Sequence, residues 1–319
     1  MKLLVCAMEA SSNVHLKELK KYLNDDVELV GVFDKELGNP LYDLTALAIM
    51  GIVDALKKLR FFFKLRDELV DLAKDCDKVL LMDSSGFNLP LAKKLRETYP
   101  NKEIIYYILP QAWAWKKGRV KKLEAYCSKL CSIIPFESEI YSDKNKITYV
   151  GHPLLDEITE FKKEFKETNK IAFMPGSRKT EITNLMPIFR ELARKIPNKE
   201  YVLIIPAKFD DEYIKRIYGD ISDFTISKNT HKTLQESEYA FICSGTATLE
   251  AALIGTPFTL SYIAKKFDFF IGKMFVKLNY VGLANIFFEK MGRTQLHNEF
   301  LQDEVSVENL LNDYKNMNK

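Results

Sequence analysis

The chain has 319 residues, of which 47% are apolar and 12% aromatic, which is enough for two domains with a core each. Its net charge of +3 is too small to indicate nucleic-acid binding, and no segment has the regular basic groove that such binding uses. No apolar run reaches the roughly 20 residues of a membrane-spanning helix. We therefore expect a protein that is soluble or rests on a membrane surface.

The five cysteines are odd in number and widely spaced, which predicts reduced thiols in a cytosolic protein. Cys127 and Cys131 have the spacing of half a zinc site. No second pair or nearby histidine completes it, so we predict neither a metal nor another cofactor.

The first half of the chain alternates apolar strands with polar turns and amphipathic helices. Residues 2–8 form a strand that runs into a polar turn at 9–12 and a helix at 14–23. Residues 78–83 form another strand, followed by a helix at 89–99. Further short strands are expected at 27–33, 103–109, 131–135 and 148–150. Such alternation predicts an α/β fold with a parallel sheet covered by helices on both faces.

A charged segment at 156–170 separates this series from a second one and reads as a hinge. The second series has expected strands at 171–174, 201–206, 224–226, 239–243 and 258–262. We therefore predict two doubly wound domains, 1–165 and 166–319, with a tail that could pack back on the first. Ligands of such folds bind at the carboxyl ends of the strands.

Two segments, 50–72 and 265–277, mix aromatic residues with lysine and arginine, as helices in a lipid interface do. The first contains Phe61, Phe62, Phe63, Lys64 and Arg66. Three consecutive phenylalanines cannot all face one core from one helix, which favours a membrane surface over the alternative, a core-facing stripe with a basic outer face.

Residues 171–181 read as a strand, a Pro-Gly turn and a helix opened by Ser177 as N-cap. The first free N–H groups of such a helix, with Gly176 and Ser177 before it, point into the crevice above the sheet. Arg178 is out of place for the helix itself but suits a bound phosphate. The alternative is a solvated arginine after an ordinary turn.

Asp83 ends a strand and would point into the crevice of the first domain, where a carboxylate can accept a proton from a substrate hydroxyl. The alternative is that the Asp83 side chain caps the helix that follows. In the second domain Ser244, Gly245 and Thr246 form another strand–helix junction that suits a diphosphate, and Glu250 could bind a ribose. The spacing matches neither an ATP nor an NAD motif.

Seven stretches, in order along nearly the whole chain, together resemble the lipid-A-disaccharide synthase family of glycosyltransferases. They are FNLPLAKK (87–94), PQAWAWKKGRV (110–120), IPFE (134–137), VGHPLLD (150–156), PGSR (175–178), SGTATLEAAL (244–253) and YVGLANI (280–286).

The resemblance implies a GT-B architecture, in which two Rossmann-like domains face each other across a cleft, and an inverting transfer without a metal. The implied donor is UDP-2,3-diacylglucosamine and the implied acceptor is 2,3-diacylglucosamine 1-phosphate. The product would be the β-1,6-linked disaccharide 1-phosphate plus UDP. The enzyme would be cytoplasmic and peripheral on the inner face of the inner membrane, with a homodimer as one expected assembly.

Residue by residue, the resemblance implies that Asp83 and Arg178 are essential and that Glu9 is the acidic residue of the first loop. Ser11, Ser12, Gln111 and Asn285 match acceptor-side positions, whereas Trp113 and Trp115 read mainly as core packing. The first loop departs from the family pattern, because it reads MEASSN at 8–13 where the family has Gly-Glu-x-Ser-Gly-Asp. Gly86 also replaces a second aspartate.

Two alternatives remain at this stage. The first is another UDP-sugar enzyme of the same fold, such as a UDP-N-acetylglucosamine transferase or epimerase. The second is a non-catalytic, membrane-bound binder of UDP-sugars, which the altered first loop makes conceivable.

Overall fold

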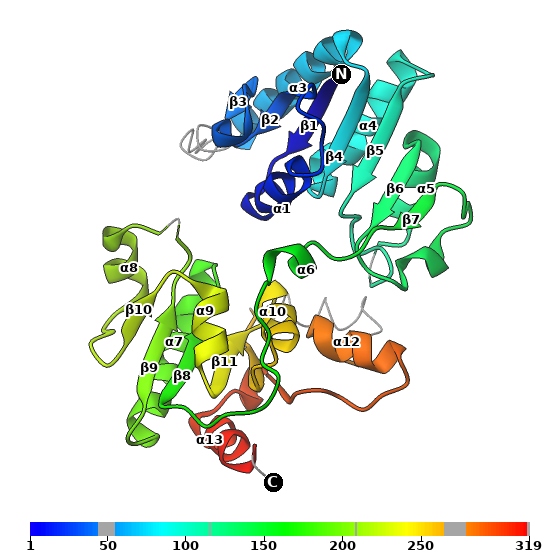
Figure 1. Ribbon diagram of the computed structural model, residues 1–319. Helices are drawn as coiled ribbons and strands as arrows, with labels where there is room; N and C mark the ends of the chain where they lie inside the picture. Colours follow the sequence, from blue (N-terminus) through cyan, green and yellow to red (C-terminus); the bar gives the residue numbers. More distant parts are fainter. Residues whose placement is uncertain (44–54, 115, 208, 265–278, 318–319) are drawn as a thin grey trace. The chain divides into compact units, whose positions relative to one another are not determined.

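A computed structural model describes residues 1–43, 55–114, 116–207, 209–264 and 279–317 (Figure 1). The chain divides into two compact units, Met1–Glu157 and Ile158–Lys319. Each unit is an α/β structure built on its own parallel sheet.

The first unit contains a seven-stranded sheet in the order β3-β2-β1-β4-β5-β6-β7, and all its neighbouring strands run parallel. Its strands are β1 (Lys2–Ala7), β2 (Glu28–Phe33), β3 (Tyr42–Asp43), β4 (Lys78–Met82), β5 (Glu103–Tyr107), β6 (Lys129–Ser132) and β7 (Ile147–Tyr149). Its helices are α1 (Ala10–Lys20), α3 (Ala55–Leu72), α4 (Ser85–Thr98), α5 (Gly118–Tyr126) and α6 (Leu154–Glu157).

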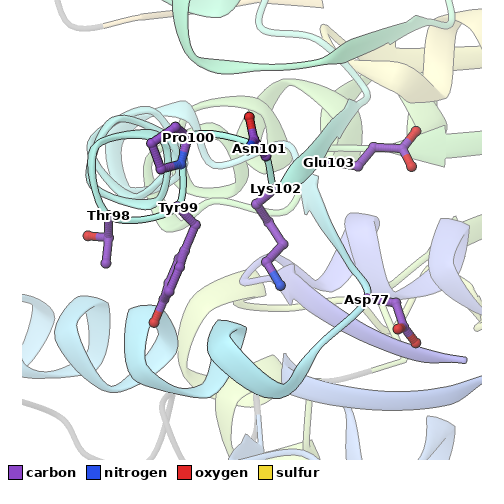
Figure 2. A pocket seen from close by; sticks show the side chains of 7 residues that line it. All are labelled: Asp77, Thr98, Tyr99, Pro100, Asn101, Lys102 and Glu103. Carbon is purple, nitrogen blue, oxygen red and sulfur yellow. The ribbon is translucent and has the colours of Figure 1, made fainter.

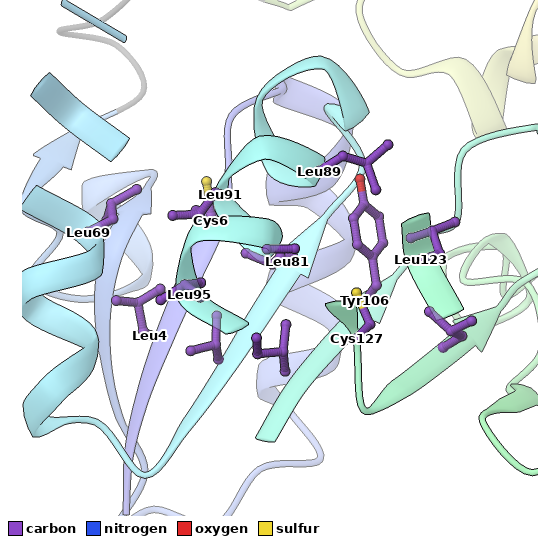
Figure 3. Packing of buried hydrophobic residues seen from close by; sticks show 14 of the residues in the cluster. Leu4, Cys6, Leu69, Leu81, Leu89, Leu91, Leu95, Tyr106, Leu123 and Cys127 are labelled. Carbon is purple, nitrogen blue, oxygen red and sulfur yellow. The ribbon is translucent and has the colours of Figure 1, made fainter. Parts of the chain in front are cut away.

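The central strands of this sheet are apolar on both faces because helices cover both. Leu4 and Cys6 of β1 pack with Leu81 and with side chains of α3, α4 and α5 on one face (Figure 3). Leu3 and Val5 point to the opposite face, where they join a second cluster that includes Leu16 of α1. Successive strand residues alternate between faces, so a strand buried on both sides reads as a continuous apolar run.

The second unit contains a six-stranded parallel sheet in the order β10-β9-β8-β11-β12-β13. Its strands are β8 (Lys170–Met174), β9 (Glu200–Ile204), β10 (Thr225–Ser227), β11 (Tyr239–Cys243), β12 (Phe258–Tyr262) and β13 (Glu299–Leu301). Its helices are α7 (Lys179–Lys195), α8 (Asp211–Tyr218), α9 (Thr230–Glu236), α10 (Thr246–Ile254), α12 (Leu283–Lys290) and α13 (Val307–Asn316).

The predicted fold class, two doubly wound parallel sheets, is confirmed. The sequence did not predict β3 and β13, which are only two and three residues long and so leave little periodic signal. The structure also places the division between the units earlier than the predicted 165/166. Ile158 is buried and the Lys162 N–H donates to the Ile254 carbonyl at 2.7 Å, so the charged segment belongs to the second unit.

The described part of the C-terminal tail ends in α13, and its predicted packing on the first domain stays a prediction. Helix α13 packs on the second unit, where Leu310 is fully buried in the core. The Tyr239 hydroxyl donates to Asp313 at 2.9 Å and the Tyr314 hydroxyl to Glu238 at 2.7 Å. None of the helices in the described ranges combines the length and apolar character that a bilayer crossing requires.

Gly31 provides a test of how the first sheet is built. Its φ of +122° is reached easily only by glycine, and an added Cβ would lie 2.2 Å from the Val5 carbonyl oxygen. We expect Gly31→Ala to destabilise the first unit by about 3 kcal/mol or more, since both backbone strain and a clash with main-chain atoms result. Urea unfolding followed by circular dichroism measures the loss.

Gly118→Ala is the matched control, because Gly118 opens α5 and an added Cβ meets no atom within 4 Å. We expect that change to be neutral or slightly stabilising. Equal stabilities of the two variants would show that this account of β2 is incorrect.

Candidate active site

Asp83 lies at the carboxyl edge of the first sheet, directly after β4, and its backbone is tightly held. Its φ is +50°, an uncommon value for a residue other than glycine. Its N–H donates to the Tyr107 carbonyl at 3.3 Å, and its carbonyl accepts bonds from the Tyr106 hydroxyl and, at 3.0 Å, the Asn88 amide. Strain of this kind persists only where the surroundings impose it, which is common at functional sites.

The Asp83 carboxyl is half-buried and has a raised pKa. Burial is the largest cause, and the neighbouring Glu9 carboxylate is the second. The helix-cap alternative is not supported, because Ser84 occupies the N-cap of α4 and that helix has no side-chain cap bond. Asp83 is therefore a carboxylate whose environment makes it a better base than a solvated aspartate.

Glu9 comes from the end of β1, the strand next to β4, and is held beside Asp83. It occupies the N-cap of α1. The Ser84 hydroxyl donates to Glu9 Oε1 at 3.0 Å. Because parallel strands end at one edge, Glu9 and Asp83, which are far apart in the chain, form one pair of acids.

Ser12 has a different role from the one predicted. It is fully buried, its hydroxyl donates to the Glu9 carbonyl at 2.8 Å, and it accepts from the Glu9 N–H at 3.2 Å. The prediction that it binds the acceptor is therefore corrected: Ser12 completes the cap that holds Glu9. Ser11, in the same turn, is exposed.

Asn13 stabilises the loop that departs from the family pattern. Its amide nitrogen donates to the carbonyls of Ala7 and Glu9, both at 2.8 Å. Its amide oxygen accepts from the Asp34 N–H at 2.7 Å. One side chain thus connects the ends of β1 and β2 to α1, so the altered sequence still gives a well-defined loop.

A histidine pair near Asp83 had no signal in the sequence. His15 Nδ1 lies 2.8 Å from Glu157 Oε1, and the charge of His15 acts to lower the pKa of Asp83. Burial and the nearby His15 lower the pKa of His152 to about 4, so the His152 ring is neutral. Its Nδ1 accepts the Leu154 N–H at 3.2 Å. No local sequence pattern reveals the pairing of His15 with Glu157, which are 142 positions apart.

At the carboxyl edge of the second sheet, the Pro-Gly-Ser-Arg turn joins β8 to α7, but the helix begins later than predicted. Arg178, and not Ser177, is the N-cap residue. The N–H groups of Ser177 and Arg178 donate to Glu181 Oε2 at 3.2 and 3.1 Å. The prediction that these N–H groups are free for an anion is therefore corrected.

Glu181 also explains why this turn contains glycine. A Cβ on Gly176 would lie 2.5 Å from Glu181 Oε2, and the φ of Gly176 is +97°. Arg178 Nη1 donates to Glu181 Oε1 at 2.8 Å, while 76% of the Arg178 side chain is exposed. The hydrogen bond to Glu181 raises the pKa of Arg178, so the guanidinium stays charged at the rim of the sheet. The spacing of Glu181 at the third helical position was the available sequence signal.

The turn at Ser244, Gly245 and Thr246 follows β11, the strand beside β8. Gly245 has a φ of +147°, and an added Cβ would meet no atom within 4 Å. The Thr248 hydroxyl donates to the Gly245 carbonyl at 2.8 Å, which fixes the turn while its outer side stays open. Within α10, Glu250 is half-buried and lies 3.5 Å from His231 Nε2.

Asn285 lies in the second unit, on α12, and is fully buried. Its amide nitrogen donates to the His297 carbonyl and to Glu299, and its oxygen accepts the N–H groups of Leu296 and His297. These bonds occupy the whole amide, so the prediction that Asn285 binds the acceptor is corrected to a structural role.

Gln111 is exposed in the loop after β5, at the same edge of the sheet as Asp83. Trp113 is half-buried and packs edge-on against Phe136 with ring centroids 5.1 Å apart, which agrees with its interpretation as core packing. Trp115 and the basic-aromatic segment at 265–277 lie outside the described residues.

The three phenylalanines of α3 do not share one environment. Phe61 and Phe62 pack against the core of the first unit, where Phe61 meets Tyr42 and Phe62 meets Phe87. Phe63 is 49% exposed, and the Arg66 guanidinium lies 5.2 Å from its ring centroid. Phe61 and Phe62 are thus partly buried against the core, and the predicted membrane contact of these residues stays a prediction.

A cavity of about 490 Å³ lies elsewhere in the first unit and is open to solvent (Figure 2). Asp77 and Glu103, which line it, stand at the amino ends of β4 and β5. Because Asp83 follows the carboxyl end of β4, this cavity is at the opposite edge of the sheet and is not part of the candidate site.

Comparison with known proteins decides the family. The family model described as lipid-A-disaccharide synthetase matches residues 3–319. The chain belongs to this family. The lipid-A-disaccharide synthase of Helicobacter acinonychis is 50% identical, and the match covers 99% of this chain and 90% of that protein. The synthase of Campylobacter jejuni is 48% identical, with coverages of 98% and 90%.

A member of the lipid-A-disaccharide synthetase family is a glycosyltransferase of lipid A biosynthesis, and this conclusion disfavours both alternatives left open by the sequence. Solved structures agree on the fold. A UDP-GlcNAc 2-epimerase from Neisseria meningitidis matches with a TM-score of 0.60 at 13% identity, over 99% of this chain and 91% of that one. The calicheamicin glycosyltransferase CalG4 matches with a TM-score of 0.58 at 11% identity, over 98% and 88%.

The pairing of Glu9 with Asp83 leads to a test by pH. Glu9→Gln keeps the size of the side chain and removes a charge that raises the pKa of Asp83. The base form of Asp83 then persists to lower pH, so the acid limb of the kcat/KM profile should move to lower pH. Steady-state transfer assays across pH measure it.

Glu36→Gln, a change at an exposed carboxylate of the same unit, should leave the limb in place. A limb that stays fixed in Glu9→Gln, or moves to higher pH, would show that the two acids do not interact.

Proposed function

We propose that the chain transfers the sugar of UDP-2,3-diacylglucosamine to the 6-hydroxyl of 2,3-diacylglucosamine 1-phosphate, with Asp83 as general base. The observation that carries this proposal is the half-buried Asp83 carboxyl beside Glu9, with its raised pKa, at the carboxyl edge of the first sheet. A sugar hydroxyl is a weak nucleophile, and a base removes its proton as the new bond forms. Attack from the face opposite UDP inverts the anomeric carbon.

Glu9 has two roles in this proposal. Its charge raises the proton affinity of Asp83, and its remaining acceptor capacity can orient a donor hydroxyl of the acceptor sugar. The bond from Ser84 holds one carboxylate oxygen of Glu9 in place. The rigid backbone of Asp83 reduces the motion that must be frozen in the transition state.

Charge develops on the UDP leaving group, and the second unit supplies groups of the right kind to stabilise it. Arg178 presents an exposed, permanently charged guanidinium that matches a phosphate oxygen pair. The turn at Ser244, Gly245 and Thr246 offers hydroxyls and a backbone that a diphosphate can approach closely. Each well-placed donor contributes about 3 kcal/mol to such a transition state. In this mechanism Glu250 is assigned to the ribose of the donor.

Removal of the base tests this proposal. Asp83→Asn retains the shape of the side chain but cannot accept the proton, so kcat should fall by about 10²- to 10⁴-fold. The Kd for UDP should stay within about twofold, because the proposed UDP contacts lie in the other unit. Product formation is followed by mass spectrometry, and UDP binding by calorimetry.

Asp25→Asn, at an exposed aspartate of the first unit, is the matched control and should keep full turnover. Near-normal turnover of Asp83→Asn would exclude Asp83 as the base.

We propose that the enzyme meets its acylated substrates at a membrane surface and that α3 contacts this surface. Leu59 and Phe63 are 52% and 49% exposed, and Arg60 and Lys64 are exposed beside them. Apolar side chains flanked by cations suit an anionic lipid surface. We assign this face of α3 to the inner leaflet of the inner membrane, and assign assembly as a homodimer from the family resemblance.

Vesicle flotation with anionic phospholipid tests the membrane surface. Phe63→Ser should weaken vesicle binding by about tenfold, since a partly inserted ring contributes about 1.4 kcal/mol. Phe61→Ser should instead lower the stability of the first unit, because its ring packs on the core. Tyr22→Ser, at a ring that is 70% exposed on a different surface, is the control and should bind normally. Unchanged binding of Phe63→Ser would refute the assignment.

A further inference from the structure

The loop that carries Gln111 is strained at both ends. It follows β5 and lies next to the candidate base, since the Asp83 N–H donates to the carbonyl of Tyr107. Ile108 and Lys116 both have positive φ values, +60° and +54°. A β-branched residue such as isoleucine rarely adopts this conformation, and surrounding contacts must hold it there.

The main contact of this loop is with the segment after β6. Trp113 packs edge-on against Phe136, which is itself buried. Phe136 is followed by Glu137, the first residue of a short 3-10 helix, η3 (Glu137–Ile140). Only 1% of Glu137 is exposed, and no part of the mechanism above uses this carboxyl.

The hydrogen bonds around Ser132 show which form of Glu137 fits the structure. The Ser132 oxygen lies 2.7 Å from the Ile134 carbonyl oxygen and 2.6 Å from Glu137 Oε2, and it accepts the Ile134 N–H at 3.2 Å. A hydroxyl has one hydrogen, and a carbonyl oxygen has none. Ser132 must therefore donate to Ile134, and the second short contact needs a proton from the carboxyl group.

The environment of Glu137 agrees with this assignment. Burial raises the pKa of Glu137 to about 7, although the Ser132 hydroxyl, the Trp113 indole and the Ile134 N–H act in the opposite direction. The Trp113 indole nitrogen lies near the carboxyl group but does not reach hydrogen-bond geometry. Tyr141 also interacts with Glu137, and its hydroxyl is buried and neutral at this pH.

We propose that Glu137 is a positioning residue that, as a neutral acid, fixes the described part of this loop, 108–114, through Trp113 and Phe136. When the pH rises, Glu137 loses its proton to solvent. Ser132 then turns its hydrogen from the Ile134 carbonyl to the new carboxylate, and the Ile134 carbonyl loses that bond. The buried charge also draws in water, which loosens the packing of Trp113. The strained loop relaxes, and Gln111 moves with it.

The kinetic part of this inference rests on the proposed function, in which Gln111 contacts the acceptor, whereas the spectroscopic part does not. The chain has only two tryptophans, Trp113 and Trp115, and both lie in this loop. In a Trp115→Phe background, the fluorescence of Trp113 reports the loop directly.

A fluorescence titration through pH 7 is the first test. We expect a one-proton transition of Trp113 emission with a midpoint near 7, absent in Glu137→Gln, which should keep the low-pH signal because glutamine is neutral at all pH. Glu97→Gln, at an exposed carboxylate of α4, should retain the transition. A parent protein without a transition, or a Glu137→Gln variant that retains it, would overturn the proposal.

If circular dichroism shows that Glu137→Gln does not fold, the same fluorescence titration is made on a Trp113→Phe variant that retains Trp115. A transition of the same size in that variant would refute the role of Trp113. For the kinetic test, the acceptor KM of the parent should rise up to tenfold per pH unit above the midpoint. The acceptor KM of Glu137→Gln should not change with pH over this range. A fluorescence transition without any change in acceptor KM would refute the positioning role, while the Asp83→Asn assay tests the base independently.

Discussion

Two like-charged acids, Glu9 and Asp83, held side by side at the ends of adjacent parallel strands are the interaction on which the site of the first unit depends. Neither would have this environment alone: burial raises the proton affinity of Asp83, and the charge of Glu9 adds to it. The surrounding residues keep the pair together despite its repulsion. Ser12 and Asn13 fix the loop of Glu9, while Tyr106 and Asn88 fix the backbone of Asp83.

The second unit holds a permanent positive charge, that of Arg178, at the rim of its sheet. Glu181 holds this turn in place, because its carboxylate accepts hydrogen bonds from the N–H groups of Ser177 and Arg178 and from one guanidinium nitrogen of Arg178. Gly176 leaves the space that Glu181 needs. Glu181 thus already occupies the first N–H groups of the helix, so the proposed recognition of a diphosphate relies on the side chain of Arg178 and the open turn at Gly245.

Burial separates residues that share a motif into different roles. Asn285 and Ser12 sit in stretches that resemble substrate-binding motifs, yet both are buried and bonded to the protein. On α3 the helical turn of about 100° per residue directs Phe61 and Phe62 toward the core and leaves Phe63 in solvent. Glu137 is the opposite case, because its motif suggested no special role, yet burial raises its pKa to about 7.

The sequence by itself determined the two parallel sheets, because alternating strands and helices are local patterns, and it identified Asp83, Arg178 and the Gly245 turn, because each follows a strand. It also carried the family motifs. Only the tertiary structure decided that Glu9 adjoins Asp83, that His15 meets Glu157, that Glu181 occupies the first N–H groups of α7, and that Ser132 shares a proton with Glu137. The physical reason is that hydrogen bonding and burial depend on which chain segments become neighbours, and the periodicity of one segment contains no record of its partner.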